Sequence, residues 1–85
     1  MSKPILYGTP LCPDCPPMVE YLDSKGFGYE YVDITASIAD LKAFLKLRDS
    51  RKEFDPMREN GSIGIPVLVM DGKVYFSEEI QELIK

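Results

Sequence analysis

Two cysteines lie three positions apart in the stretch LCPDCPPM, residues 11–18, and the chain contains no other cysteine and no histidine. Residues three apart on a helix share a face, so the Cα atoms of Cys12 and Cys15 should lie about 5–6 Å apart, within the span of a disulfide. A pair at this spacing beside a β-α-β pattern is typical of thiol–disulfide exchange. These two thiols are therefore the candidate reactive groups.

The two cysteines are expected to have different roles. Cys12 lies at the end of a β-to-α connection, where the free N–H groups of the helix end stabilise a thiolate, so it would attack a substrate disulfide. Cys15 lies in the first helical turn and should be more buried and protonated, so it would resolve the mixed disulfide that results.

The residues between and after the cysteines modify this chemistry. Pro13, Pro16 and Pro17 fall at or before the first helical turn, where a missing N–H costs little, so they stiffen the motif without breaking the helix. The carboxylate of Asp14, about 6 Å from Cys12, opposes a thiolate by about 0.7 kcal/mol in water and about 3 kcal/mol at an effective dielectric constant of about 20. The helix end favours the thiolate by about 0.3–2 kcal/mol.

Other uses of a cysteine pair remain open on these residues. A four-ligand zinc site needs two more ligands, and only carboxylates are available within the chain. A second copy of the pair or an external thiol would complete an iron–sulfur site, and a static disulfide is the third alternative. We expect no metal site within the chain itself.

Hydrophobic periodicity predicts the order β-α-β-α-(α)-β-β-α. Strands are expected at 4–7, 29–34, 66–70 and 73–76, and helices at 15–25, 38–49, 55–59 and from Ser77 onward. Asp71-Gly72 is typical of a two-residue hairpin turn, and Ser37 and Ser77 are the expected helix N-caps. The pattern predicts one mixed sheet of four strands with helices on its faces, an α/β architecture.

Apolar stripes predict which helical side chains face this sheet. The predicted set is Met18, Val19 and Leu22 in the first helix, Ile38, Leu41, Phe44 and Leu45 in the second, and Ile80, Leu83 and Ile84 in the last.

Size and charge restrict the function classes. A net charge of −4 over 85 residues argues against nucleic acid as a partner. Residues 42–58 hold six basic and three acidic side chains, a local charge of +3, which indicates either a solvated helix face or a docking patch for an anionic partner. The sequence shows no signal-peptide core and no membrane span, so we expect a monomeric, cytoplasmic protein without membrane contacts.

With CPDC at a β-to-α junction, Gly64-Ile65-Pro66 before a strand and a final hairpin followed by a helix, the sequence resembles the glutaredoxins of the thioredoxin-fold superfamily over nearly its whole length. The resemblance implies that residues 1–85 form a single glutaredoxin-like domain, with a thioredoxin-like fold whose four-stranded mixed β-sheet is flanked by three or four helices. It implies a cis Pro66, and substrate binding by the backbone of Ile65.

The resemblance also implies an enzyme that reduces protein disulfides or glutathione mixed disulfides, without a bound cofactor and with glutathione as a candidate co-substrate. Many glutaredoxins have a lysine where this chain has Thr9, which makes Thr9 a candidate substrate-binding residue, and a glycine pair where it has Tyr75-Phe76. Ser77 would hold a glutathione carboxylate and Glu78 would repel one. Arg48 and Arg51 would compensate if the connection before Pro66 folded over the site. The electron donor is thus either glutathione or a reductase of the thioredoxin-reductase type.

Two functions without turnover remain as alternatives. One is a glutathione-assisted iron–sulfur carrier, although a proline after the first cysteine, as Pro13 is, disfavours cluster assembly in this family. The other is a redox-responsive module that binds a partner through residues 42–58.

Overall fold

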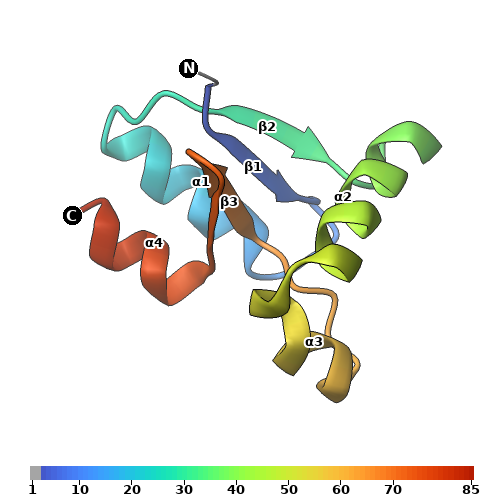
Figure 1. Ribbon diagram of the computed structural model, residues 1–85. Helices are drawn as coiled ribbons and strands as arrows, with labels where there is room; N and C mark the ends of the chain where they lie inside the picture. Colours follow the sequence, from blue (N-terminus) through green and yellow to red (C-terminus); the bar gives the residue numbers. More distant parts are fainter. Residues whose placement is uncertain (1–2) are drawn as a thin grey trace.

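The computed structural model describes residues 3–85, and its elements follow the predicted order (Figure 1). These elements are β1 (Ile5–Gly8), α1 (Cys15–Ser24), β2 (Glu30–Asp33), α2 (Ile38–Ser50), the short 3₁₀ helix η1 (Lys52–Phe54), α3 (Asp55–Asn60), β3 (Val67–Met70), β4 (Lys73–Tyr75) and α4 (Ser77–Leu83). The predicted ends lie within one residue of these bounds, and only η1 was not expected.

The four strands form one mixed sheet, as predicted, and their order in it is β2-β1-β3-β4. β1 pairs in parallel with β2 and antiparallel with β3, which continues into β4 through a hairpin. The turn residues Asp71 and Gly72 have φ angles of 53° and 76°, the left-handed backbone that a two-residue turn of the predicted kind needs. Because Tyr7 pairs with Val67, the end of β1 and the start of β3 lie at the same edge of the sheet.

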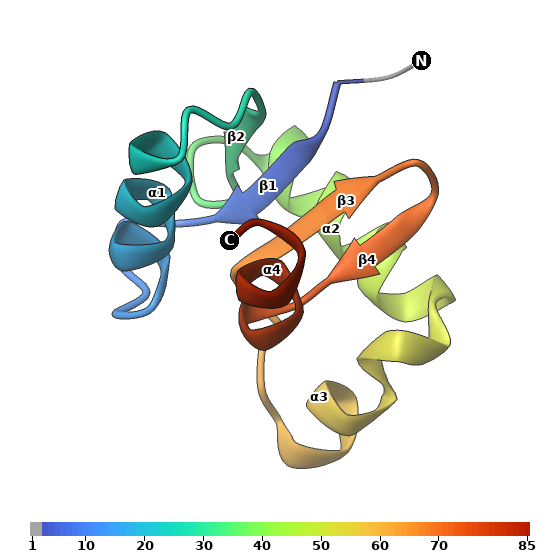
Figure 2. The ribbon, with the colours of Figure 1, turned by 90° about the vertical axis from the view of Figure 1, so that its left-hand side faces the viewer.

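Side chains alternate between two apolar layers, one on each face of the sheet. Helices α1 and α4 cover one face, and α2 with η1 covers the other (Figure 2). The first core consists of Leu6, Met18, Leu22, Leu68 and Ile80, and the second of Ile34, Phe44, Phe54, Val67 and Val74. The sheet is therefore buried on both sides, which fixes the loops at its edges.

The prediction that helical side chains face the sheet is wrong for three residues. Ile38, Leu45 and Leu83 are 67%, 38% and 46% exposed. Ile38 and Leu83 are the first and last residues of their helices, where a neighbouring helical turn covers them on one side only. In α2 the buried stripe runs through Leu41, Phe44 and Leu47, which turns Leu45 toward solvent.

The predicted N-cap is confirmed at α2 but not at α4. The Ser37 hydroxyl accepts the Asp40 N–H at 3.1 Å, the predicted N-cap. The predicted cap at Ser77 is wrong, because Phe76 is the N-cap residue and its own N–H donates to Glu79 Oε1 at 3.1 Å. Ser77 is therefore the first residue of α4. Within residues 3–85, every helix is too short or too polar to span a bilayer.

Candidate active site

The cysteine loop is built from two consecutive turns between β1 and α1. The Cys12 N–H donates to the Thr9 carbonyl at 3.1 Å, and the Cys15 N–H donates to the Cys12 carbonyl at 3.2 Å. Cys15 is the first residue of α1, and prolines occupy its opening positions as expected. The side chain of Asp14 is exposed and makes no capping hydrogen bond. The loop therefore holds Cys12 just outside the helix end.

The two sulfurs lie in different surroundings, and both are free thiols. Cys12 is half-buried, whereas Cys15 is 0% exposed. The pKa of the Cys15 thiol is raised to about 11, chiefly by burial; a hydrogen bond from the Thr9 backbone opposes this rise and the sulfur of Cys12 adds to it. Cys15 is therefore a neutral thiol at pH 7, and Cys12 is the sulfur that a substrate can reach.

Gly8 and Tyr31 form the wall behind the buried sulfur. A Cβ added to Gly8 would lie 2.9 Å from Cys15 Sγ and 3.4 Å from Tyr31 Cε1, so the sulfur packs directly on the glycine backbone. The pKa of the Tyr31 phenol is raised, first by burial and then by the charge that Cys15 would carry. Sequence reasoning missed both residues; the signal was a glycine at the end of a strand leading into the CPDC motif.

Thr9 anchors the cysteine loop and does not face solvent. Its side chain is 5% exposed, and its hydroxyl accepts the Leu11 N–H at 3.3 Å and lies 3.1 Å from the Thr35 hydroxyl. Thr35 in turn donates to Asp33 Oδ1 through its hydroxyl and its N–H, which holds the pKa of the Asp33 carboxyl below its usual range. Thr9 therefore ties the loop to the end of β2, and its contact with a substrate stays a prediction.

The peptide bond between Ile65 and Pro66 is cis, as the resemblance implied. Pro66 is buried and precedes β3, so the pairing of β1 with β3 puts it at the sheet edge where the cysteine loop begins. Gly64 before it has a φ of 98°, and a Cβ there would lie 2.9 Å from the ring of Phe54. A side chain at position 64 would thus disturb the segment that positions Pro66.

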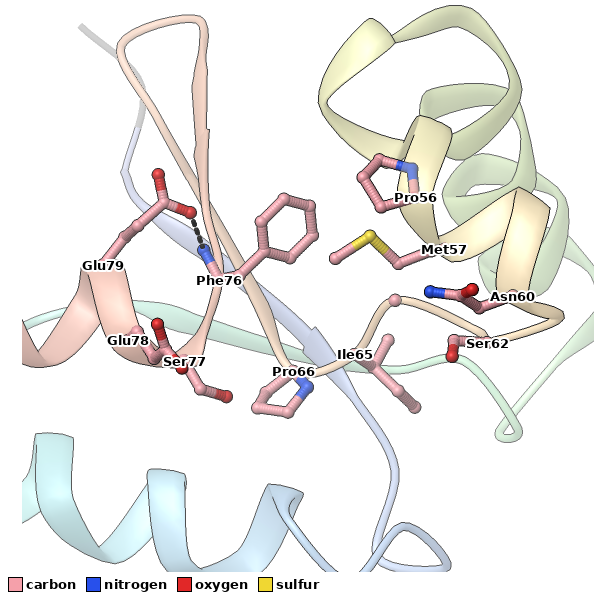
Figure 3. Close-up of a pocket in the computed structure, with 11 residues that line it drawn as sticks. Pro56, Met57, Asn60, Ser62, Ile65, Pro66, Phe76, Ser77, Glu78 and Glu79 are labelled. Atoms are coloured by element: carbon pink, nitrogen blue, oxygen red, sulfur yellow. Dashed lines mark hydrogen bonds between the residues drawn. The ribbon is translucent and has the colours of Figure 1, made fainter.

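A hollow of about 510 Å³ opens beside Pro66, and we call it the Pro66 groove (Figure 3). It brings together four of the predicted substrate-binding residues, which are Ile65, Pro66, Ser77 and Glu78. The rest of its lining consists of Pro56, Met57, Asn60, Ser62, Gly64, Phe76 and Glu79. Sequence reasoning did not identify the contribution of α3, because it gave this helix no role in the site.

A second hollow, of about 380 Å³, lies between α1 and α4, and we call it the Asp14 hollow. Its lining comprises Asp14, Pro17, Met18, Tyr21, Ser77 and Gln81. Ser77 lines both hollows, so they adjoin at the start of α4, and Asp14 places one end of the second beside the cysteines.

The two arginines expected at the site bind backbone carbonyls, and only the Ser62 carbonyl belongs to a residue of the groove lining. Arg48 donates to the carbonyls of Ser62 and Ile63 at 2.6 and 2.9 Å. Arg51 donates to the Gly72 carbonyl at 2.9 Å, in the hairpin turn at the far end of β3 from Pro66, and pairs with Glu53 at 3.0 Å. Neither arginine lines the Pro66 groove or the Asp14 hollow.

Residues 3–85 contain no group of three or more cysteine, histidine, aspartate or glutamate side chains placed to hold a metal ion. The reactive groups that the site brings together are thus the two thiols, with a groove beside them.

The comparison with known families agrees with this geometry, because the family model for glutaredoxin matches residues 5–75. The chain belongs to the glutaredoxin family. An uncharacterized protein of Haemophilus influenzae is 49% identical over 70 residues, 82% of this chain and 81% of that protein. An uncharacterized glutaredoxin-like 8.6 kDa protein from the rubredoxin operon of Clostridium pasteurianum is 32% identical over 84 residues, 94% of this chain and 95% of that one.

Among solved structures, this glutaredoxin-family chain is similar to a crystal structure of a mutant of the thioredoxin-like protein BC3987. The TM-score is 0.68 at 28% sequence identity, over 98% of this chain and 91% of the other. The thioredoxin-like fold implied by the sequence is thereby confirmed.

Proposed function

We propose that this protein is a dithiol oxidoreductase that reduces disulfides by thiol–disulfide exchange, with Cys12 as the nucleophile and Cys15 as the resolving thiol. The observation that carries the proposal is the contrast between neighbouring sulfurs, one half-buried just outside the helix end and one fully buried and neutral. A reactive cysteine must be reached and ionised, whereas a resolving cysteine must wait until the mixed disulfide has formed.

The first step is attack of the Cys12 thiolate on one sulfur of the substrate disulfide. The bond between Cys12 and that sulfur forms, the substrate S–S bond breaks, and the second substrate sulfur leaves as a thiolate. Cys15 then gives its proton to this thiolate and attacks Cys12 Sγ. The Cys12–Cys15 disulfide forms, the bond between Cys12 and the substrate breaks, and the first substrate sulfur leaves as a thiolate that takes a proton from water. The substrate thus gains two electrons, one proton from Cys15 and one proton from the solvent.

Regeneration requires an external thiol donor and no bound cofactor. Glutathione and a reductase of the thioredoxin-reductase type are the two candidate donors, and protein disulfides and glutathione mixed disulfides are the two candidate substrates. A cytoplasmic setting suits this chemistry, because its reducing thiol pools keep such a pair reduced.

The test is reduction of a peptide with one internal disulfide, coupled first to glutathione with its reductase and then to thioredoxin reductase. Wild-type protein should turn over with at least one donor. The Cys12→Ser variant should be inactive, and the Cys15→Ser variant should accumulate a Cys12–peptide adduct detectable by mass spectrometry. Turnover by Cys12→Ser, or an adduct on Cys15 in place of Cys12, would contradict the assigned roles.

A further inference from the structure

We infer that the Pro66 groove selects polypeptide disulfides flanked by lysine or arginine and an apolar residue, and disfavours glutathione mixed disulfides. This inference rests on the proposed function and concerns the substrate of the same site. It follows from the position, the charge and the apolar surface of the groove, which are independent of the redox chemistry.

The groove lies at the same edge of the sheet as the cysteine loop. Pro66 and the cysteine loop occupy the same edge of the sheet, because β1 ends and β3 begins there. The Pro66 groove adjoins the Asp14 hollow at Ser77, and Asp14 lies between the two cysteines in sequence. A chain covalently joined to Cys12 therefore extends over one or both hollows.

The charges that line this path are all negative. Glu78 and Glu79 line the Pro66 groove and Asp14 lines the second hollow, whereas no lysine or arginine lines either of them. All three carboxylates are exposed, and Glu79 uses one oxygen to accept the Phe76 N–H. Fixed charges of one sign along a groove raise the local concentration of ligands of the opposite sign. Basic side chains on a substrate are thus favoured.

The arginines of α2 and its C-terminal end do not line the groove. Arg51 binds the Gly72 carbonyl in the distant hairpin turn, and Arg48 donates to the carbonyls of Ser62 and Ile63 behind one side of the lining, where its donors are already used. Glutathione carries two carboxylates and one ammonium group, a net charge of −1, and would meet repulsion from Glu78 where the site offers no cation.

Apolar surface surrounds the same path. Leu11 precedes Cys12 and is 81% exposed, and Ile63 is 55% exposed beside the segment that leads to Pro66. Inside the groove, Met57, Ile65 and Phe76 are half-buried and contribute apolar atoms to the lining (Figure 3). Large exposed apolar side chains next to a reactive sulfur fit a polypeptide, whose own side chains can cover them.

The experiment compares four oxidised substrates under single-turnover conditions with reduced protein, so that no recycling donor is needed. Three are peptides with one internal disulfide and one neighbouring leucine, identical except for lysine, glutamine or glutamate on each side of the disulfide. The fourth is the glutathione mixed disulfide of a glutamine-flanked cysteine peptide. Substrate loss is followed by chromatography of acid-quenched samples at low salt and at 1 M salt.

The lysine peptide should react about tenfold faster than the glutamate peptide at low salt, with a smaller ratio at 1 M salt, since steering by fixed charges is screened. The glutathione mixed disulfide should react more slowly than the lysine peptide. Equal rates for the lysine and glutamate peptides, or faster reaction of the glutathione mixed disulfide, would overturn the inference.

Two variants of Glu78 and one control variant test whether the charge preference comes from the groove. Glu78→Lys should remove or invert the ratio between the lysine and glutamate peptides, and Glu78→Gln should reduce it. Glu30→Lys is the matched control, because Glu30 is exposed, pairs with Ile5 at the opposite end of β1, and gives the same change in net charge. An unchanged ratio in both Glu78 variants, or an equal loss in Glu30→Lys, would refute selection by the groove.

Failure of the inference and failure of the proposed function give different results. Reduction of the glutamine peptide, with equal rates for the lysine and glutamate peptides, would refute only the inferred substrate class. No reduction of any peptide disulfide by wild-type protein removes the proposed function, and the inference with it.

Discussion

Replacing Gly8 by alanine should push directly on the buried sulfur of Cys15. The new Cβ would lie 2.9 Å from Sγ, well inside the separation of about 3.5–4.0 Å that is optimal for carbon atoms. Cys15 is 0% exposed, and the same Cβ would touch Tyr31 at 3.4 Å, so the sulfur has no open side toward which to move. One added methyl group therefore overfills the wall behind the cysteine loop.

Overpacking of this kind costs about 1–3 kcal/mol in the free energy of unfolding. Gly8 does not have a positive φ, so alanine also restricts the unfolded chain, which offsets about 0.4–1 kcal/mol of that loss. A net loss of about 1 kcal/mol would lower the melting temperature by about 4–8 °C in a domain of this size. Gly28→Ala is the matched control: no atom lies within 4 Å of its added Cβ, so it should not be destabilised.

The decisive measurement is a double-mutant cycle with Cys15→Ala, by urea unfolding under reducing conditions. Removing Sγ leaves the Gly8→Ala methyl group facing only ordinary contacts at 3.4 Å, so the cost of Gly8→Ala should largely disappear in the Cys15→Ala background. The same cost in both backgrounds, or an equal cost for Gly28→Ala, would refute the contact between Gly8 and the sulfur.

Three further predictions concern the cap of α2, the buried thiol and the motif carboxylate. Ser37→Ala should lower the free energy of unfolding by about 0.5–2 kcal/mol through loss of the Asp40 N–H bond, and an unchanged urea midpoint would contradict it. Folding raises the pKa of the Cys15 thiol from 9.0 to about 11, so this thiol ionises at lower pH in the unfolded state than in the folded state. The free energy of unfolding should therefore fall between about pH 9 and 11, and should fall less in the Cys15→Ala variant. Parallel plots of this free energy against pH for the two proteins would disprove the prediction. Asp14→Asn should speed alkylation of Cys12 at pH 7 about threefold or more by removing repulsion of its thiolate; slower labelling in peptide maps would reverse the argument.

The fold was predictable because its boundaries carry strong local signals. Gly26 has a φ of 66°, and the N–H of Phe27 reaches the Leu22 carbonyl at 3.2 Å, which is the left-handed ending that a glycine after an amphipathic helix indicates. Asp71-Gly72 signals the hairpin in the same way. The exposed ends at Ile38 and Leu83 were not predictable, because periodicity identifies a face of a helix but not how far the neighbouring elements extend along it.

The candidate site was predictable in its chemistry and less so in its surroundings. Cys12, Cys15 and Pro66 belong to short motifs whose geometry is local. Arg48 and Arg51 are not local, since each binds a carbonyl 14 to 21 residues away along the chain. Which carbonyl a long side chain reaches depends on how the segment before Pro66 folds, and composition alone does not contain that information.

Two residues near the start of α4 and in the cysteine loop have hydrogen-bond partners that the sequence did not indicate. A serine before an amphipathic stretch normally caps the helix. Here the Phe76 N–H donates to Glu79 Oε1, so Phe76 is the N-cap residue and Ser77 is the first residue of α4, where it lines both hollows. The hydroxyl of Thr9 accepts the Leu11 N–H of the cysteine loop and lies within hydrogen-bond distance of the Thr35 hydroxyl. The linings of the two hollows contain the carboxylates of Asp14, Glu78 and Glu79 and no lysine or arginine. Substrate charge, more than disulfide chemistry, is therefore expected to determine what this protein reduces.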